Sequence, residues 1–171
     1  MNRFFGYGSL VNRRTHVYGG DALTVRGWRR VWRHTPLRPV AFLTAMPDPE
    51  AVIDGLAAEV PGGDWTALDA REAAYLRAPL PEGPAIYHIP EGHHGPATEA
   101  HPILRSYLDV VVQGYLSEFG REGVARFFDS TAGWDAPIRD DRARPLYSRA
   151  QQVTAEETAI VDAELARVRK G

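Results

Sequence analysis

The sequence predicts an α+β fold in a single domain that spans residues 1–171. The length is close to that of one domain, and 44% of the residues are apolar, enough to build a hydrophobic core. Short segments rich in β-branched and aromatic side chains, bounded by glycine and proline, occupy the first 60 residues. Apolar residues at helical spacing dominate the remainder, and strands followed by helices are typical of the α+β class.

The amino-terminal segments predict an antiparallel or mixed sheet or barrel, because they are short and closely spaced. Turn-forming glycine and proline separate them at residues 19–21, 47–49 and 61–63. The strands expected in this half cover residues 3–7, 23–32, 40–45 and 52–60. A further strand is expected at residues 85–89, followed by a turn-rich loop at residues 90–98.

Helical spacing begins at Asp64, a suitable N-cap, and predicts a helix over residues 64–77. A second helix is expected over residues 102–119, because proline stands at an early position and Gly120 at its end. A third is expected over residues 122–129.

The carboxyl-terminal part begins with an irregular stretch that runs to Arg149. Thr154 and Glu157 then have the spacing of a capping box, which predicts the start of a last helix. One apolar stripe of this helix is formed by Val161, Leu165 and Val168.

Composition and charge exclude several classes of protein. Lysine and arginine number 20 against 22 aspartate and glutamate, so the net charge of −2 offers no large positive field to nucleic acid or anionic lipid. The absence of cysteine excludes disulfides, thiolate zinc sites and a cysteine nucleophile. The sequence shows neither a signal peptide nor an apolar run of about 18 residues. We expect a cytoplasmic protein that needs no cofactor or metal; its oligomeric state is left open.

Glu72 interrupts the apolar stripe of the helix predicted at residues 64–77. At about 100° per residue its side chain projects near those of Trp65, Leu68 and Leu76. Burial on that side would disfavour the ionised carboxylate and raise its pKa, as in general acids and bases. The alternative is a glutamate at the helix end that pairs with one of the many arginines.

A glycine-containing loop, Gly6-Tyr7-Gly8-Ser9-Leu10, directly follows the first predicted strand. Two glycines at alternate positions permit a tight turn that presents backbone N–H groups in a concave arrangement, as in oxyanion holes. The loop lacks the third glycine of a dinucleotide fingerprint and the Gly-x-Ser-x-Gly of a nucleophile elbow. Taken alone, the pentapeptide is an ordinary exit from a strand into a turn.

Three segments in this order carry a resemblance: Tyr7-Gly8-Ser9-Leu10, Gly27-Trp28-Arg29-Arg30-Val31-Trp32 and Leu68-Asp69-Ala70-Arg71-Glu72-Ala73-Ala74-Tyr75. Their order and spacing resemble the γ-glutamylcyclotransferase superfamily over residues 3–75. Ser106-Tyr107-Leu108, with Gly114, is similar to a tyrosine-bearing helix of the same group.

The resemblance implies a small mixed β-barrel flanked by helices, with a cavity at one mouth and no cofactor. The implied reaction cleaves a small-molecule γ-glutamyl substrate to 5-oxoproline and a free amine or amino acid. Glu72 matches the acid/base carboxylate, and the loop that binds the γ-glutamyl moiety is matched by Tyr7, Gly8, Ser9 and Leu10. The glutathione-directed branch commonly has a glycine pair where this chain has Ala73-Ala74, so the identity of the substrate does not transfer.

The residues suit a reaction in which the substrate's α-amine attacks its own γ-carbonyl. The protein has only to fold the substrate, transfer a proton and stabilise an oxyanion. Glu72 would transfer the proton, and the N–H groups of residues 8–10 would hold the carbonyl oxygen or the α-carboxylate. Tyr107 is a candidate hydrogen-bond donor to the substrate or, alternatively, a core aromatic.

Other functions and sites remain as alternatives. A non-catalytic binding or regulatory module on the same barrel would use Glu72 to pair with the ammonium of a ligand. A serine hydrolase with Ser9 as nucleophile would need a histidine oriented by a carboxylate, and no spacing nominates one. His93 and His94 are adjacent, but no third metal ligand is near them. An arginine from the mixed-charge segment 139–149 could meet a carboxylate of the substrate.

Overall fold

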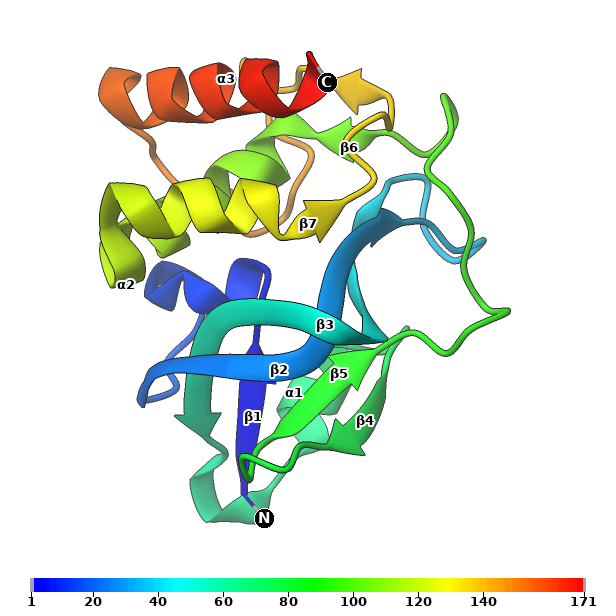
Figure 1. The fold of residues 1–171 in the computed structure, drawn as a ribbon, viewed down its shortest axis with the longest axis vertical. Helices are drawn as coiled ribbons and strands as arrows, with labels where there is room; N and C mark the ends of the chain where they lie inside the picture. Colours follow the sequence, from blue (N-terminus) through cyan, green and yellow to red (C-terminus); the bar gives the residue numbers. More distant parts are fainter. Residues whose placement is uncertain (1, 171) are drawn as a thin grey trace.

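A computed structural model describes residues 2–170. Helices α2 and α3 pack together at one end of the molecule, and most of the main sheet lies with the short helix α1 at the other (Figure 1). The elements are β1 (Arg3–Gly6), β2 (Gly20–Arg33), β3 (Phe42–Glu59), α1 (Thr66–Arg71), β4 (Leu76–Pro79), β5 (Ala85–His88), β6 (Ile103–Leu104), α2 (Arg105–Asp129), β7 (Thr131–Ala132), β8 (Ile138–Arg139) and α3 (Ala155–Arg169). The α+β class predicted from the sequence is therefore confirmed.

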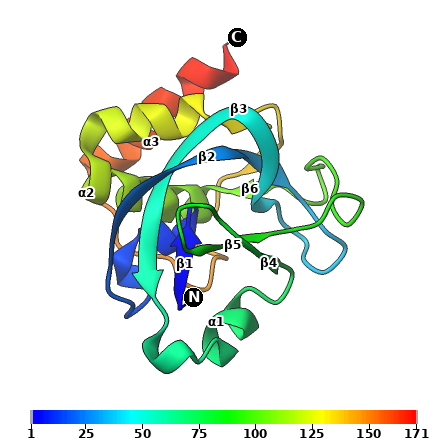
Figure 2. The ribbon, with the colours of Figure 1, turned by 60° about the horizontal axis from the view of Figure 1, so that its bottom comes forward.

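The main sheet is mixed and has six strands in the order β4-β5-β1-β3-β2-β7. The pairs β1–β5 and β2–β7 are parallel, whereas the other neighbours are antiparallel. Strands β2 and β3 form a long, strongly curved ribbon (Figure 2). The expectation of a barrel is wrong, because β4 and β7 end the sheet without pairing with each other in the part described. With only two residues, β7 offers too short an edge for closure.

Strand β3 is continuous where the sequence predicts a turn between two strands at residues 47–49. Between Pro47 and Val52, β3 has additional residues opposite Gly27 of β2, so the proline-rich segment forms an irregularity instead of a chain reversal. Only the last residues of β3 pair with β1. At Pro47, β3 therefore has β2 as its one neighbouring strand within residues 2–170, and its other edge is unpaired there. Proline is tolerated at such edge positions because no second neighbour requires its missing N–H.

Helix α1 is much shorter than the helix predicted over residues 64–77. It ends at Arg71, and Glu72 is its C-cap with φ −102° and ψ 36°. The following residues join the sheet, because β4 pairs with the free edge of β5 from Leu76 onward. Leu76 is 59% exposed, so the helical stripe that was expected to bury Glu72 does not exist.

Helix α2 joins the second and third predicted helices. The break between them is at Gly120, whose φ of 69° interrupts the helical backbone at the predicted end. The predicted start at residue 102 is wrong, because residues 103 and 104 form β6 and pair with β8. Neither two-residue strand has enough residues to show an alternating pattern in the sequence. The predicted capping box is confirmed: Thr154 and Glu157 exchange hydrogen bonds at the start of α3.

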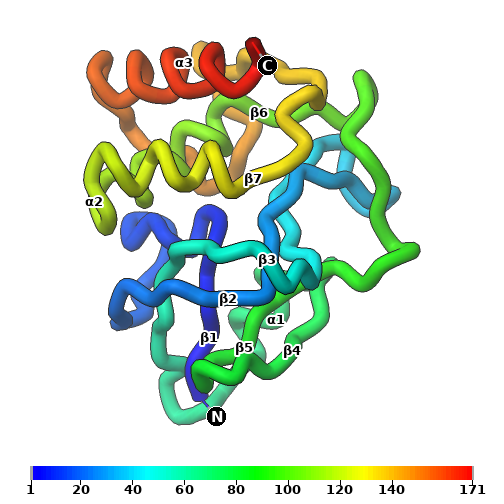
Figure 3. Tube along the Cα trace, viewed as in Figure 1, coloured from blue at the N-terminus to red at the C-terminus, as the bar shows by residue number. Residues whose placement is uncertain are grey.

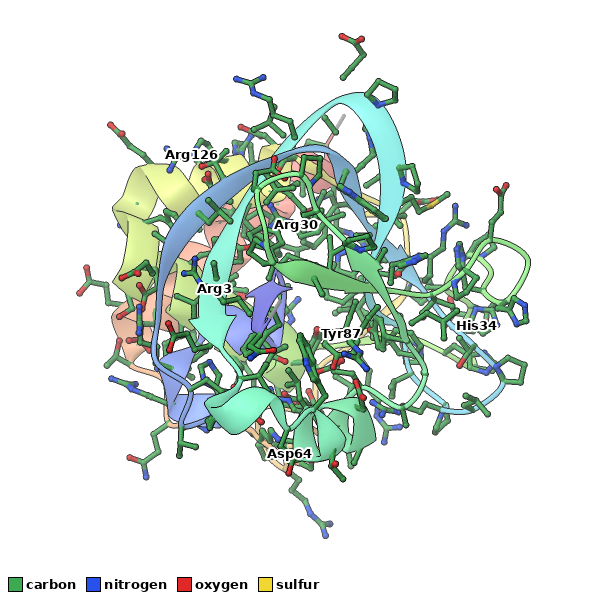
Figure 4. All side chains as sticks on the ribbon, turned by 90° about the horizontal axis from the view of Figure 1, so that it is seen from below. Arg3, Arg30, His34, Asp64, Tyr87 and Arg126 are labelled. Atoms are coloured by element: carbon green, nitrogen blue, oxygen red, sulfur yellow. The ribbon has the colours of Figure 1, made fainter. Side chains whose placement is uncertain are left out.

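The main core lies between the sheet and the helices, and the charged side chain of Arg30 is buried against it. Arg30, labelled in Figure 4, is completely buried and packs over the neighbouring rings of Tyr115 and Phe127, with 5.0 and 4.8 Å from its Cζ to the ring centroids. Its Nη2 donates to the Ser130 hydroxyl at 3.0 Å, and burial lowers the pKa of the guanidinium. Arg30 therefore cross-links β2 to α2 by cation–π contacts.

Polar contacts fasten the loop after β1 to α2 and to α3. Asn12 donates from Nδ2 to the Gln113 side-chain oxygen at 2.9 Å. Gln113 donates from Nε2 to a carboxylate oxygen of Glu157, the capping-box residue of α3, also at 2.9 Å. The helix and the loop touch closely at Gly114, where a Cβ would lie 2.6 Å from the Asn12 nitrogen. These contacts fix the position of the glycine-containing loop.

The segment predicted as a loop at residues 90–98 contains no extended strand or helix. It runs beside the connection between β2 and β3 (Figure 3), and His34 and Gly95 exchange backbone hydrogen bonds there. Of the helices described, none has the length and apolar character needed to cross a membrane.

Candidate functional site

The chain forms a cleft where the loop after β1 meets the end of α1 and the first turn of α2. Its empty space, open solvent included, is about 330 Å³. The structure brings every site residue predicted from the sequence to this inner cleft: Tyr7, Gly8, Ser9, Leu10, Glu72 and Tyr107. Its other lining residues are Phe5, Gly6, Leu43, Tyr75 and Tyr87.

Glu72 occupies the rim of the inner cleft as the C-cap of α1. Its side chain is 16% exposed, and this burial raises the pKa of the carboxyl above its usual value. The nearby guanidinium groups of Arg71, Arg38 and Arg149 oppose that rise. Both interpretations of Glu72 thus hold in part: it ends the helix beside an arginine, and it is nevertheless shielded from solvent.

Arg71 connects the end of α1 to the loop after β1. Its Nη1 donates to the Thr15 carbonyl at 2.9 Å, and its Nη2 donates to the Thr15 hydroxyl at 3.1 Å and to the Ser9 hydroxyl at 3.3 Å. The remaining Nε lies 3.5 Å from a Glu72 carboxylate oxygen, an ion contact without hydrogen-bond geometry. Within residues 2–170, no side-chain hydrogen bond reaches the Glu72 carboxylate, which leaves both of its oxygens available to a ligand.

Three tyrosines surround the carboxylate, and burial raises the pKa of each, so all three keep their proton. The Tyr7 hydroxyl donates to the Tyr87 carbonyl, and the Tyr75 hydroxyl donates to the Leu43 carbonyl at 2.7 Å. Tyr107 packs its ring edge-on against that of Tyr147 at 5.0 Å between centroids. Tyr107 therefore combines both expected roles, because it packs like a core aromatic and also lines the cleft.

Tyr87 also lines the inner cleft, and Figure 4 shows it close to α1. Its hydroxyl donates to a carboxylate oxygen of Asp69 on α1 at 2.5 Å, and the Trp65 ring lies 6.3 Å away between centroids. Strand β5 and helix α1 are thereby held together beneath the site.

The two glycines of the loop are required for close packing, not for a left-handed backbone conformation. Neither has a positive φ. A Cβ on Gly6 would lie 2.5 Å from Leu10 Cβ, and a Cβ on Gly8 would lie 3.0 Å from the Tyr107 hydroxyl oxygen. After Gly8 the chain forms a single 3-10 turn, residues Ser9–Val11, in which the Val11 N–H donates to the Gly8 carbonyl at 3.1 Å. The N–H groups that precede it have no partner within the turn.

A second cleft adjoins the first and has an empty space of about 530 Å³; it is called the outer cleft because its lining includes the exposed Arg38 and Arg149. The two clefts share Ser9, Glu72, Tyr75 and Tyr107. The outer cleft adds residues from the β2–β3 connection, the start of α2 and the segment before α3, namely Arg38, Val40, Ala41, Phe42, Arg71, Leu104, Tyr147 and Arg149.

Sequence reasoning missed several of these residues. Arg71 and Tyr75 stand inside the segment that carries the resemblance, so their positions next to Glu72 were a usable signal. Arg38 and Tyr147 lie in irregular segments far apart in the sequence, and no periodicity marks them. Arg149 is the one arginine of the 139–149 segment that reaches the outer cleft.

The other candidate functions lack residues that they require. No histidine of the described chain lines either cleft, so Ser9 lacks the base that a serine hydrolase requires. His93 and His94 stay in the loop at residues 90–98, and residues 2–170 contain no group of three histidine, aspartate or glutamate side chains placed to hold a metal ion. Arg142 belongs to a structural contact, donating to both carboxylate oxygens of Asp109 at 2.8 Å.

No family model matches the sequence, and neither does any curated protein. Among solved structures, a γ-glutamyl cyclotransferase matches with a TM-score of 0.56 and 12% identity, over 95% of this chain and 98% of that one. An uncharacterized protein from Homo sapiens matches with a TM-score of 0.55 and 12% identity, over 94% of this chain and 98% of that one. YkqA from Bacillus subtilis matches with a TM-score of 0.61 and 13% identity, over 81% of this chain and 56% of that one. The chain thus has the γ-glutamylcyclotransferase-like fold.

Proposed function

We propose that the protein is a γ-glutamylcyclotransferase, which converts a γ-glutamyl compound to 5-oxoproline and a free amine or amino acid. The observation that carries the proposal is the Glu72 carboxylate: shielded from solvent, raised in pKa and free of side-chain hydrogen bonds, it lies between two connected clefts. A carboxylate held in this way is suited to accept and return a proton. The likeness in fold to a γ-glutamyl cyclotransferase supports the same reaction class.

The reaction is an intramolecular transfer of the γ-acyl group. Glu72 takes a proton from the substrate's α-ammonium, and the freed amine attacks the γ-carbonyl carbon. A new C–N bond closes the five-membered ring, and the bond from the γ-carbon to the leaving nitrogen breaks. Glu72 returns the proton to that nitrogen. The ring nitrogen then gives up its second proton, which the released amine takes up, so the lactam is neutral and no water is consumed. Because nucleophile and electrophile belong to one molecule, the protein mainly fixes the folded conformation of the substrate.

The remaining lining groups position the substrate. The N–H groups at the start of the 3-10 turn, Ser9 and Leu10, are available for the carbonyl oxygen or the α-carboxylate. The Tyr107 hydroxyl is a protonated donor beside Gly8. Arg71 keeps this loop and Glu72 at a fixed separation through its contacts with Ser9 and Thr15.

The reaction type is tested with a panel of γ-glutamyl amino acids, free or acetylated at the α-amine, incubated in ¹⁸O-labelled water. We expect 5-oxoproline without solvent oxygen from the free compounds and no turnover of the acetylated ones. The reason is that the lone pair of an amide nitrogen is delocalised, so no positioning restores its nucleophilicity.

Two results would contradict the proposal. Labelled glutamate, or turnover of an acetylated compound, would indicate hydrolysis. Saturable binding of the panel without any product would indicate the non-catalytic binding module instead, with Glu72 as the counter-ion of a ligand ammonium.

A further inference from the structure

We propose, resting on the function proposed above, that the leaving portion of the substrate carries a carboxylate and that Arg38 and Arg149 bind it in the outer cleft. The substrate class is then a γ-glutamyl amino acid or peptide, as opposed to a γ-glutamyl derivative of a simple amine. The proposal depends on the arrangement of the two clefts and on the charges along the outer one.

The arrangement of the clefts determines which part of the substrate lies in which cleft. The γ-carbonyl must lie beside Glu72, because this side chain exchanges protons with both nitrogens. Glu72 belongs to the boundary that the clefts share, together with Ser9 and Tyr107. The inner cleft holds the glutamyl part against its tyrosines and loop, so the leaving portion extends into the outer cleft.

The charges of the outer cleft favour an anionic ligand. Its lining holds three guanidinium groups, those of Arg38, Arg71 and Arg149, against the single carboxylate of Glu72. Arg71 is committed to Ser9 and Thr15. Arg38 and Arg149 are exposed and have no carboxylate within salt-bridge distance in the part of the chain that is described. Both are near enough to Glu72 to influence the pKa of its carboxyl.

The two arginines come from different segments of the chain. Arg38 lies in the connection between β2 and β3, and Arg149 lies in the segment before α3. The same cleft has apolar lining side chains, among them Val40, Phe42 and Leu104. An amino acid fits this pattern, because its carboxylate can meet a guanidinium while its side chain contacts the apolar wall. A simple amine would leave both guanidinium groups without a partner.

The test compares γ-glutamyl-alanine with γ-glutamyl-ethylamide, which differ in the leaving portion mainly by one carboxylate. The measured quantity is the ratio of their kcat/KM values for 5-oxoproline release, in which any effect on Glu72 itself cancels. For the wild type we expect a ratio above about ten, the size of one charge-assisted hydrogen bond. Arg38→Gln and Arg149→Gln should each lower the ratio severalfold, and the double variant should bring it close to one.

Controls separate binding from general charge effects. Arg144→Gln removes an exposed arginine of the same segment that does not line the outer cleft, and it should leave the ratio unchanged. High salt should lower the wild-type ratio, because exposed charges are screened. A ratio that stays the same in both arginine variants, or a wild type that prefers the ethylamide, overturns this inference while the proposed function stands. Absence of 5-oxoproline from both compounds overturns the proposed function, and this inference with it.

Discussion

The Glu72–Arg71 and Asp109–Arg142 pairs use the same kinds of side chain in different ways. Both carboxylates are shielded from solvent, and burial raises the pKa of each. Arg142 donates hydrogen bonds to both oxygens of Asp109 at 2.8 Å. Arg71 instead donates to Ser9 and Thr15 and approaches Glu72 only to 3.5 Å.

The two carboxylates differ in whether their oxygens are free to bind a ligand; their charge and the direction of their pKa shift are the same. The Asp109 oxygens are saturated by an arginine that also bonds to Asp162 of α3, so this pair joins α2 to the carboxyl-terminal segment. The Glu72 oxygens face two clefts and keep their hydrogen-bonding capacity for a ligand. A raised carboxyl pKa is therefore a weak sign of function by itself, and the donors around the carboxylate must be examined with it.

The largest expected effect is the loss of turnover in Glu72→Gln. Glutamine is nearly isosteric and removes only the titratable group, so the rate of 5-oxoproline release should fall by about 10²- to 10⁴-fold while the substrate still binds. Steady-state kinetics together with isothermal titration check this. A variant that keeps more than half of the wild-type rate would remove Glu72 from the role of base and leave the two pairs functionally alike.

Asp109→Asn should act on stability and not on chemistry. It breaks a two-point contact with Arg142 and leaves Asp162 as the remaining carboxylate partner of this partly buried guanidinium, so the free energy of unfolding should fall by about 1 to 2 kcal/mol. Urea denaturation measures this. The kcat/KM of the folded variant should stay within a factor of about two, and a loss comparable to that of Glu72→Gln would make Asp109 part of the site.

Substitutions in the loop at residues 7–10 test whether the hydrogen bond from Arg71 to the Ser9 hydroxyl is needed to keep the Glu72 carboxylate free for a ligand. Gly8→Val places side-chain atoms against the Tyr107 hydroxyl and Leu43, so kcat/KM should fall by about tenfold or more. Ser9→Ala removes only one of the three acceptors of Arg71 and keeps the Ser9 N–H, so the fall should stay below about threefold. An equally severe loss in both variants would assign a role to the Ser9 hydroxyl.

The smallest effect is a pH-dependent gain in stability in Glu72→Gln. The folded pKa of Glu72 is raised above its unfolded value, so folding is opposed once the carboxyl ionises. The variant should be more stable than the wild type at neutral pH, and the two should converge below about pH 4, where an ordinary glutamate is protonated. Thermal unfolding across this range checks the sign.

Much of the fold could be predicted because local signals dominate it. The capping box of Thr154 and the break at Gly120 are set by a few neighbouring residues, and both stand where the sequence places them. The turn at residues 47–49 and the long helix at residues 64–77 were wrong for one reason. Strand pairing across the chain, with β2 in one case and β5 in the other, overrides the local preference.

In the candidate site, too, residues marked by a local sequence pattern could be predicted, and residues brought together by long-range folding could not. Glu72 and the loop at residues 7–10 could be identified from the sequence because a short ordered pattern contains them, although the helical stripe used to argue the burial of Glu72 is absent. Arg38 could not, and Arg149 could be anticipated only as one arginine of the 139–149 segment, because two irregular segments must fold against the cleft to bring the two residues together. The hydrogen bonds of Arg71 were equally hidden, since nothing in the sequence indicates that it reaches Thr15.

The hydrogen bonds of Gln113 connect α3 to the amino-terminal loop, so the loss of α3 would affect that loop as well. The side-chain oxygen of Gln113 accepts a hydrogen bond from Asn12, and its nitrogen donates one to Glu157. One side chain therefore links the amino-terminal loop to α3. Shortening the chain before α3 would remove the Glu157 carboxylate and leave the Gln113 amide nitrogen with the Gln152 carbonyl as its acceptor. We therefore expect substitutions in the exposed loop at residues 90–98 to be tolerated better than removal of α3.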